Sequence, residues 1–130
     1  MTFSITATQK NTMLNTISTA AGASATVVIY SGVVPANADA SLSGNTVLVT
    51  LPCSATFAPA ASGGVLTANA ITQTNCGTSG TASFYRLIAT GGSTVLAQGA
   101  VGTSGSDMNL NTTTLVSGGP VVCSSLTISM

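Results

Sequence analysis

Charged side chains are almost absent from this sequence, and histidine and tryptophan are missing altogether. Only 3% of the 130 residues are charged, whereas about 25% are charged in typical soluble domains. The charged residues are Lys10, Asp39, Arg86 and Asp107. Acid–base catalysis needs a titratable group near the working pH, and Ser or Cys nucleophiles commonly need a histidine base. We therefore predict that the chain is not an enzyme, since both aspartates lie in turn-rich loops.

The scarcity of basic residues also argues against two classes of partner. Nucleic-acid binding relies on several Lys and Arg side chains that neutralise phosphates, and attachment to anionic membranes relies on a basic cluster. Lys10 and Arg86 are too few for either, so we expect no nucleic acid and no membrane as a partner. No apolar run approaches the ~20 residues of a membrane-spanning helix. Residues 1–15 lack the features of a signal peptide, so we expect a protein made and kept in a cytoplasm.

Motifs for cofactors and metals are missing as well. The glycine-containing and turn-rich stretches 32–41 and 102–109 lack the Gly-Lys-Ser/Thr of a phosphate loop, and no strand–helix unit surrounds them. Asp39, Asp107 and Asn109 bring too few carboxylates for tight calcium binding. We therefore predict no cofactor and no metal site.

Three cysteines, Cys53, Cys76 and Cys123, are widely spaced and have no CxxC pattern. A metal site needs more ligands than these. The interpretation we favour is three reduced thiols packed as small apolar side chains. The alternative is one disulfide plus one free thiol.

The apolar fraction, by contrast, is ordinary. It amounts to 45%, rich in Val, Ile, Leu and Ala, which favours a folded core over a disordered tract. A neutral surface of Ser, Thr and Ala provides little electrostatic repulsion between copies. Such a surface suits a protein docked in an assembly. The competing interpretation is a secreted or cell-surface protein under another selection for low charge.

The clearest structural pattern lies in residues 80–102. Alternation with period 2 places Phe84, Arg86 and Ile88 on one face of a strand and Tyr85 with Leu87 on the other. Large groups on both faces suit a central strand covered on both sides. The two glycines at 91 and 92 then predict a turn with positive φ, and a second strand starts near residue 93.

Short apolar and β-branched runs separated by turn residues continue through the rest of the chain. They predict about seven to nine short strands in a single antiparallel β-sandwich or jelly-roll domain covering residues 1–130, with the sandwich in 26–130. Residues 1–25 form an N-terminal helix or an arm extended across a neighbouring subunit. The helix spans 6–20, with Thr6 or Thr8 as its cap, a stripe of Leu14, Ile17 and Ala21, and a stop at Gly22. The further strands are expected at 26–30, 45–51 (with Val47, Val49 and Leu51 on one face), around Phe57, and at 65–68, 108–111, 114–116 and 121–128.

Arg86 is the one side chain that the pattern singles out for a specific contact. A charged group in an apolar strand must reach solvent or a partner, because burying it unpaired is costly. Our hypothesis is a structural salt bridge of Arg86 with Asp39 or Asp107 that pins a loop to the sheet. The alternative is a solvated Arg86 on the outer face.

Several segments follow one another in an order that resembles a known family. They are residues 29–32 (IYSG), 35–39 (PANAD), 64–70 (GVLTANA), 80–87 (GTASFYRL), 99–105 (GAVGTSG), 107–111 (DMNLN) and 118–120 (GGP). In this order they resemble small structural proteins of tailed bacteriophages, of the head-decoration or cement type. The resemblance covers about residues 27–128, and its motifs are loop-and-strand patterns without active-site signatures.

The resemblance implies a virion protein without catalysis, made in the host cytoplasm and placed on the capsid exterior. Its expected partners are the major capsid protein, other virion proteins, and further copies of itself in a dimer or trimer. It would bridge capsid subunits and stabilise the head shell. The alternatives are a tail, neck or baseplate component and a receptor-binding module. A sugar-binding module usually exposes aromatic side chains, and this chain has no Trp and two Tyr.

Overall fold

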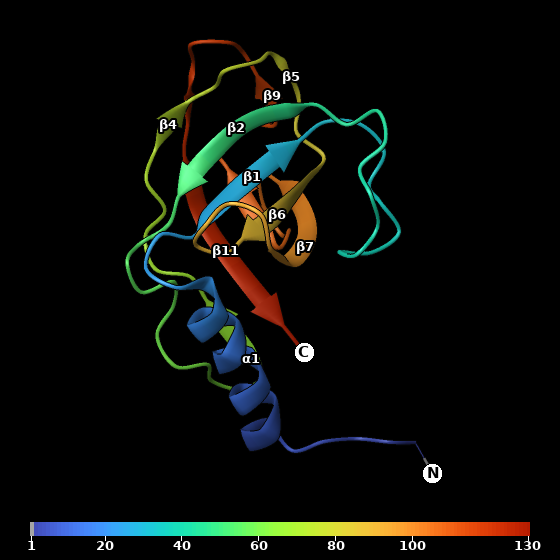
Figure 1. The fold of residues 1–130 in the computed structure, drawn as a ribbon, viewed down its shortest axis with the longest axis vertical. Coiled ribbons are helices and arrows are strands. Elements are labelled where there is room, and N and C mark those ends of the chain that lie inside the picture. Colours follow the sequence, from blue (N-terminus) through green and yellow to red (C-terminus); the bar gives the residue numbers. More distant parts are fainter. Residues whose placement is uncertain (1) are drawn as a thin grey trace.

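The computed structural model describes residues 2–130, a β-rich body with one helix, α1 (Ala7–Ala21), at one end of its longest axis (Figure 1). Seven strands form one mixed sheet in the order β2-β1-β6-β7-β8-β11-β3, and two small sheets pair β4 with β10 and β5 with β9. The mainly β composition with a single helix is confirmed, but residues 2–130 form eleven strands, more than the seven to nine expected, because several pairings are only two residues long. The strands are β1 (Thr26–Tyr30), β2 (Val47–Pro52), β3 (Val65–Thr67), β4 (Thr74–Asn75), β5 (Gly80–Thr81), β6 (Phe84–Ile88), β7 (Val95–Gly102), β8 (Met108–Leu110), β9 (Thr114–Leu115), β10 (Pro120–Val121) and β11 (Cys123–Ser129).

The expectation of a purely antiparallel sheet is wrong at one junction. β7 and β8 run parallel, with Val101 opposite Met108 and Gly102 opposite Asn109. Parallel neighbours usually need a crossover of a dozen or more residues. Here residues 103–107 are enough to connect the two strands, because the strands pair over only two residues and hydrogen bonds at the end of the loop hold it in a tight turn. The Asn109 side chain accepts from Ser106 N–H at 3.1 Å and donates to Ser106 C=O at 3.2 Å.

The hairpin predicted for residues 80–102 is confirmed. β6 pairs with β7 through a turn in which Gly91 and Gly92 have φ of 106° and 83°. All five residues of β6 are buried, and the strand lies between β1 and β7. The Tyr30 and Phe84 rings stack across β1 and β6 with centroids 5.0 Å apart. β6 is therefore a central strand covered on both faces.

The helix is confirmed together with its signals. Thr6 caps α1 by accepting from Gln9 N–H at 3.1 Å, and Gly22 ends it with φ of 76°. Asparagine disfavours helices, yet here two asparagines hold the loop beside α1. Asn11 Oδ1 accepts from Gly64 N–H at 2.9 Å, and Asn15 Oδ1 accepts from Ala61 N–H at 2.8 Å. No helix within residues 2–130 is long and apolar enough to cross a membrane.

The face expected for the strand at 45–51 is wrong because β2 contains a bulge. Tyr30 pairs with Val47 and Ile29 with Val49, so Leu48 has no opposite residue on β1. An extra residue of this kind breaks the alternation of faces. Leu48, Val49 and Leu51 are buried, whereas Val47 is exposed.

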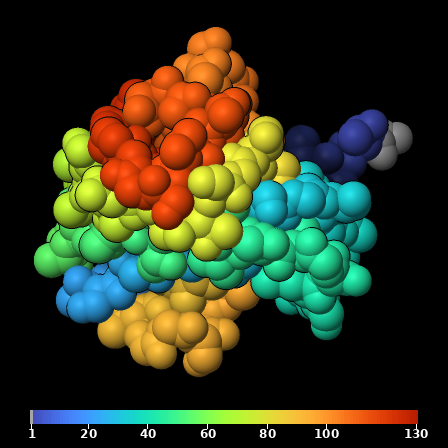
Figure 2. Space-filling model, turned by 90° about the horizontal axis from the view of Figure 1, so that it is seen from above, coloured from blue at the N-terminus to red at the C-terminus, as the bar shows by residue number. Residues whose placement is uncertain are grey.

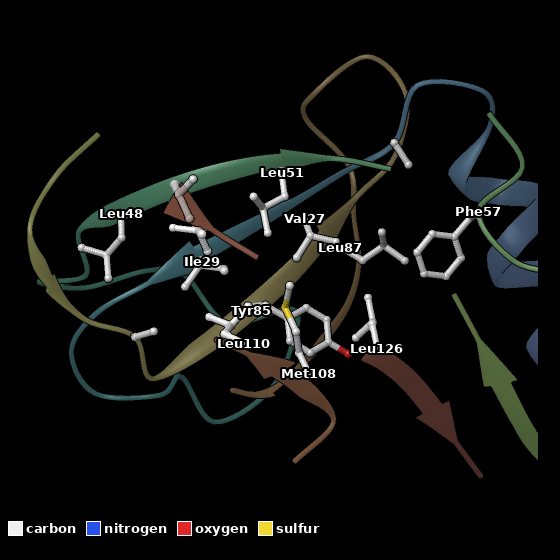
Figure 3. Packing of buried hydrophobic residues seen from close by; sticks show 14 of the residues in the cluster. Val27, Ile29, Leu48, Leu51, Phe57, Tyr85, Leu87, Met108, Leu110 and Leu126 are labelled. Atoms are coloured by element: carbon white, nitrogen blue, oxygen red, sulfur yellow. The ribbon is translucent and has the colours of Figure 1, made fainter. Parts of the chain in front are cut away.

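The core lies between strands from the two ends of the curled sheet. Figure 3 places Val27, Leu51 and Leu87 of β1, β2 and β6 across from Met108 and Leu126 of β8 and β11. The strand expected around Phe57 is absent. Phe57 instead sits in an irregular segment beside α1, fully buried in the same cluster (Figure 3).

Candidate docking surface around the Arg86 clamp

The loop between β1 and β2, residues 31–46, projects from the body at the right of Figure 1. Its base is closed by the Asn45 amide, whose Nδ2 donates to Ser31 C=O at 3.0 Å and to Val33 C=O at 2.9 Å. Ser31 N–H also donates to Thr46 C=O at 3.0 Å. These hydrogen bonds therefore hold the two ends of the loop together where it leaves β1 and enters β2.

The far part of the loop is held to the sheet by Arg86 and Gln98, which lie directly opposite each other on β6 and β7. Arg86 Nη2 donates to Ala40 C=O at 2.7 Å and, at 3.5 Å, to Asn37 C=O. Arg86 Nε donates to Gln98 Oε1 at 2.9 Å, and Gln98 Nε2 donates to Pro35 C=O at 3.0 Å. These four hydrogen bonds, called the Arg86 clamp below, attach the loop to the sheet at three positions.

The partners expected for Arg86 are wrong, although it does attach a loop to the sheet. Within residues 2–130 its guanidinium makes no ion pair with Asp39 or Asp107. Asp107 Oδ2 instead accepts from Ala100 N–H at 3.2 Å. Arg86 is only 5% exposed, so the alternative of a solvated side chain is wrong as well. Its charge faces carbonyl and amide oxygens, and such charge-assisted bonds are stronger than neutral ones.

Gln98 was missed by the sequence reasoning, and the reason is geometric. A regular two-residue turn at Gly91 and Gly92 would place Arg86 opposite Ala97. The irregularity between Leu87 and Ile88 shifts the register by one residue and brings Gln98 opposite Arg86. Bulges of this kind leave no clear mark in composition.

The clamped loop presents apolar side chains to solvent. Val33 is 84% exposed, and Val34 and Leu42 of the loop, with Val47 at the start of β2, are also among the exposed large apolar residues. We call these four side chains the 33–47 surface. Figure 2 shows this segment, coloured cyan to green, standing out from one side of the body. The chemistry available here is contact with another surface through apolar groups and backbone, beside one exposed carboxylate, Asp39, in the same loop.

Residues 2–130 contain no group of three or more His, Cys, Asp or Glu side chains placed to hold a metal ion. Burial raises the pKa of the Tyr85 hydroxyl, with Asp107 and Cys123 adding to the effect. A phenol that ionises less readily than usual is a poor acid or base at neutral pH.

The three cysteines are free thiols, with Cys76 buried and Cys53 and Cys123 half-buried. Burial raises the pKa of Cys53 to about 11, and Cys123 contributes by its charge. Burial also raises the pKa of Cys123. Raised pKa values keep the Cys53 and Cys123 thiols protonated and slow to react at neutral pH, which agrees with thiols that serve packing.

Comparisons of the chain with protein-family models, curated proteins and solved structures found no match.

Proposed function

We propose that this chain is a non-enzymatic structural protein of a tailed-bacteriophage virion, a cement or decoration protein that binds the major capsid protein on the outside of the head. The observation that carries the proposal is the 33–47 surface: exposed apolar groups on a loop that the chain's one arginine fixes from below. The buried charge of Arg86 thus holds the shape of this surface, and the surface itself has no basic group. The order of segments that resembles phage decoration proteins supplies the viral setting.

A fixed loop suits this work for a thermodynamic reason. Association costs the entropy of every side chain and loop that becomes ordered, so a loop already held in place loses less on binding. A standard interface buries about 800 Å² on each partner. The described residues expose 6619 Å², so one such contact would use about an eighth of the surface. Repeated over a shell, modest contacts of this size add up, because each copy bridges neighbouring subunits.

We also propose that the fold is of the β-sandwich or jelly-roll type. A seven-stranded sheet that curls until Val27 and Leu87 approach Met108 and Leu126 encloses its core between two halves. We group this arrangement with β-sandwich and jelly-roll domains, which viral shell proteins often use.

The test is the copy number of this chain in purified virus particles from its source, measured by quantitative mass spectrometry against the major capsid protein. A copy number comparable to that of the capsid protein is expected for a decoration protein. A few copies per particle would place it in one ring of the neck, tail or baseplate. Absence from the particles would refute the virion role.

A matched pair of variants then tests the surface itself. Val33→Ser with Val34→Ser removes apolar groups from the 33–47 surface, and Val122→Ser removes one exposed valine elsewhere. Both variants should melt like the parent. Only the first should lose binding to shells that lack the protein. Equal binding by all three proteins would exclude the 33–47 surface as the docking site.

A further inference from the structure

Two apolar features without a partner lie at opposite ends of the molecule. The first is Phe3, in the extended arm (residues 2–6) that precedes α1. Its side chain is 86% exposed, the highest value among the large apolar residues of the described chain. Figure 2 shows the arm, in dark blue, standing away from the body. An aromatic group this exposed loses much of the stabilisation that burial would give it.

The second feature is a half-open hollow of about 200 Å³ in the 111–121 segment. Its lining combines Leu115, Val116, Pro120 and Val121 with Asn111, two threonines and Gly119. Its lining includes no charged residue. A cavity of about 150 Å³ lined by apolar side chains is large enough to bind benzene. The hollow therefore has the size and chemistry to accept one phenyl ring.

The hollow is built on a fixed turn. Gly119 N–H donates to Val116 C=O at 2.8 Å, and Gly118 supports the turn with φ of 85°. The turn is tied to the chain beside it, since Gly118 N–H donates to Cys76 C=O at 2.8 Å and Cys76 N–H donates to Gly119 C=O at 2.7 Å. Val116 nevertheless remains 62% exposed at its rim. A ring entering the hollow would cover an apolar group that the fold leaves open.

Phe3 cannot reach this hollow in its own chain. The arm from Phe3 to the start of α1 spans at most about 14 Å. α1 has 15 residues, which makes it about 22 Å long, and its N-terminal end points away from the sheet (Figure 1). The hollow is lined by residues of β9 and β10, and β9 lies at the end of the long axis opposite α1 (Figure 1). Phe3 of the same chain therefore cannot fill the hollow, and a second copy is the source of a Phe3 ring that could.

We propose that Phe3 of one copy inserts into the Leu115, Val116 and Pro120 hollow of a second copy of this chain. The contact joins two different surfaces, so copies associate head to tail and build a ring or a filament, or a pair if two copies lie antiparallel. The nearly neutral surface does not oppose it. This contact deepens the self-association in the proposed function, and it does not depend on the viral setting.

The test uses complementary variants of the full chain. Phe3→Ser removes the ring and keeps the hollow, whereas Val116→Asp closes the hollow to an apolar group and keeps the ring. Sedimentation velocity over a concentration series should show association of the parent weakened at least tenfold in each variant. An equimolar mixture should form one-to-one pairs that grow no further, because each pair has one intact ring and one intact hollow.

Val122→Ser is the control, since Val122 is exposed nearby but does not line the hollow; it should associate like the parent. Circular dichroism must show both test variants folded, and methyl NMR of Leu115 in the Phe3→Ser chain should shift when the Val116→Asp chain is added. Parent-like association of Phe3→Ser, or a mixture of folded variants that stays monomeric, would overturn the proposal. Either result would leave particle attachment through the 33–47 surface unaffected, and loss of particle attachment would leave this contact standing.

Discussion

Replacing Arg86 by methionine tests the clamp that holds the 31–46 loop. Methionine keeps a long apolar stem in the buried site and removes the guanidinium. Ala40 C=O and Gln98 Oε1 then lose donors at 2.7 and 2.9 Å. We expect the loop to loosen around Ala40, while the Gln98 bond to Pro35 C=O still ties it to β7. The sheet should remain folded, because Tyr85 and Leu87 of the same strand belong to the core on the other face.

The magnitude follows from the two short hydrogen bonds that are lost. Hydrogen bonds to a charged group contribute about 1.5–3 kcal/mol each, so two short ones contribute about 3–6 kcal/mol. The contact to Asn37 C=O at 3.5 Å lies at the limit for a hydrogen bond and is left out of this sum. These values are already net of the bonds to water that folding replaces. We therefore expect Arg86→Met to lose about 3 kcal/mol, the lower end of that sum, which lowers the melting temperature by roughly 10–15 °C in a chain of this size.

Thermal melts give the global loss, and hydrogen exchange locates it. Amide exchange across residues 33–45 should accelerate at least tenfold in Arg86→Met, relative to residues 26–30 of β1 in the same sample. Arg86→Lys should fall between the variant and the parent, since a single ammonium lacks the planar fork that serves both acceptors. Lys10→Met removes the other positive charge from the partly exposed helix and should change stability by less than about 0.5 kcal/mol. Unchanged melting and unchanged loop exchange in Arg86→Met would refute the clamp.

The structure predicts the effect of three other substitutions on stability. Gly99→Ala should lower the free energy of unfolding by about 1–3 kcal/mol in denaturant titrations, because a Cβ there would lie 2.7 Å from Tyr85 Cε1. The control is Gly77→Ala, whose Cβ meets nothing closer than 3.8 Å. Equal losses in the two variants would show that the Tyr85 ring does not limit the space at Gly99. Since the pKa of Cys53 rises from 9.0 to about 11 on folding, the protonated thiol stabilises the fold fully below pH 9, and this stabilisation is lost as the pH rises through 11. Cys53→Ala should therefore lose less stability at alkaline pH than the parent in thermal melts at several pH values. An identical pH profile for the two proteins would argue against the raised pKa. Phe57→Ala should cost about 3–5 kcal/mol and loosen α1 in hydrogen exchange, whereas a small loss would mean that the segment collapses onto the gap.

Local signals predicted the elements that depend on neighbours in sequence. Thr6 and Gly22 bound α1 because a side-chain cap and a positive φ are properties of single residues. Gly91 and Gly92 made the β6–β7 turn for the same reason. Composition also indicated a β-rich, weakly charged domain, since β-branched residues and turn formers alternate throughout the chain.

The sequence alone thus determined the helix, the central hairpin, the dominance of strands and the scarcity of acid–base groups, because each depends on residue type over a few positions. Only the tertiary structure decided where the bulges fall, that β8 joins β7 in parallel, and that Arg86 meets Gln98 and Ala40 C=O rather than an aspartate. A one-residue change in register reverses which side chains share a face. Register is set by packing across the whole sheet, and no short stretch of sequence carries that information.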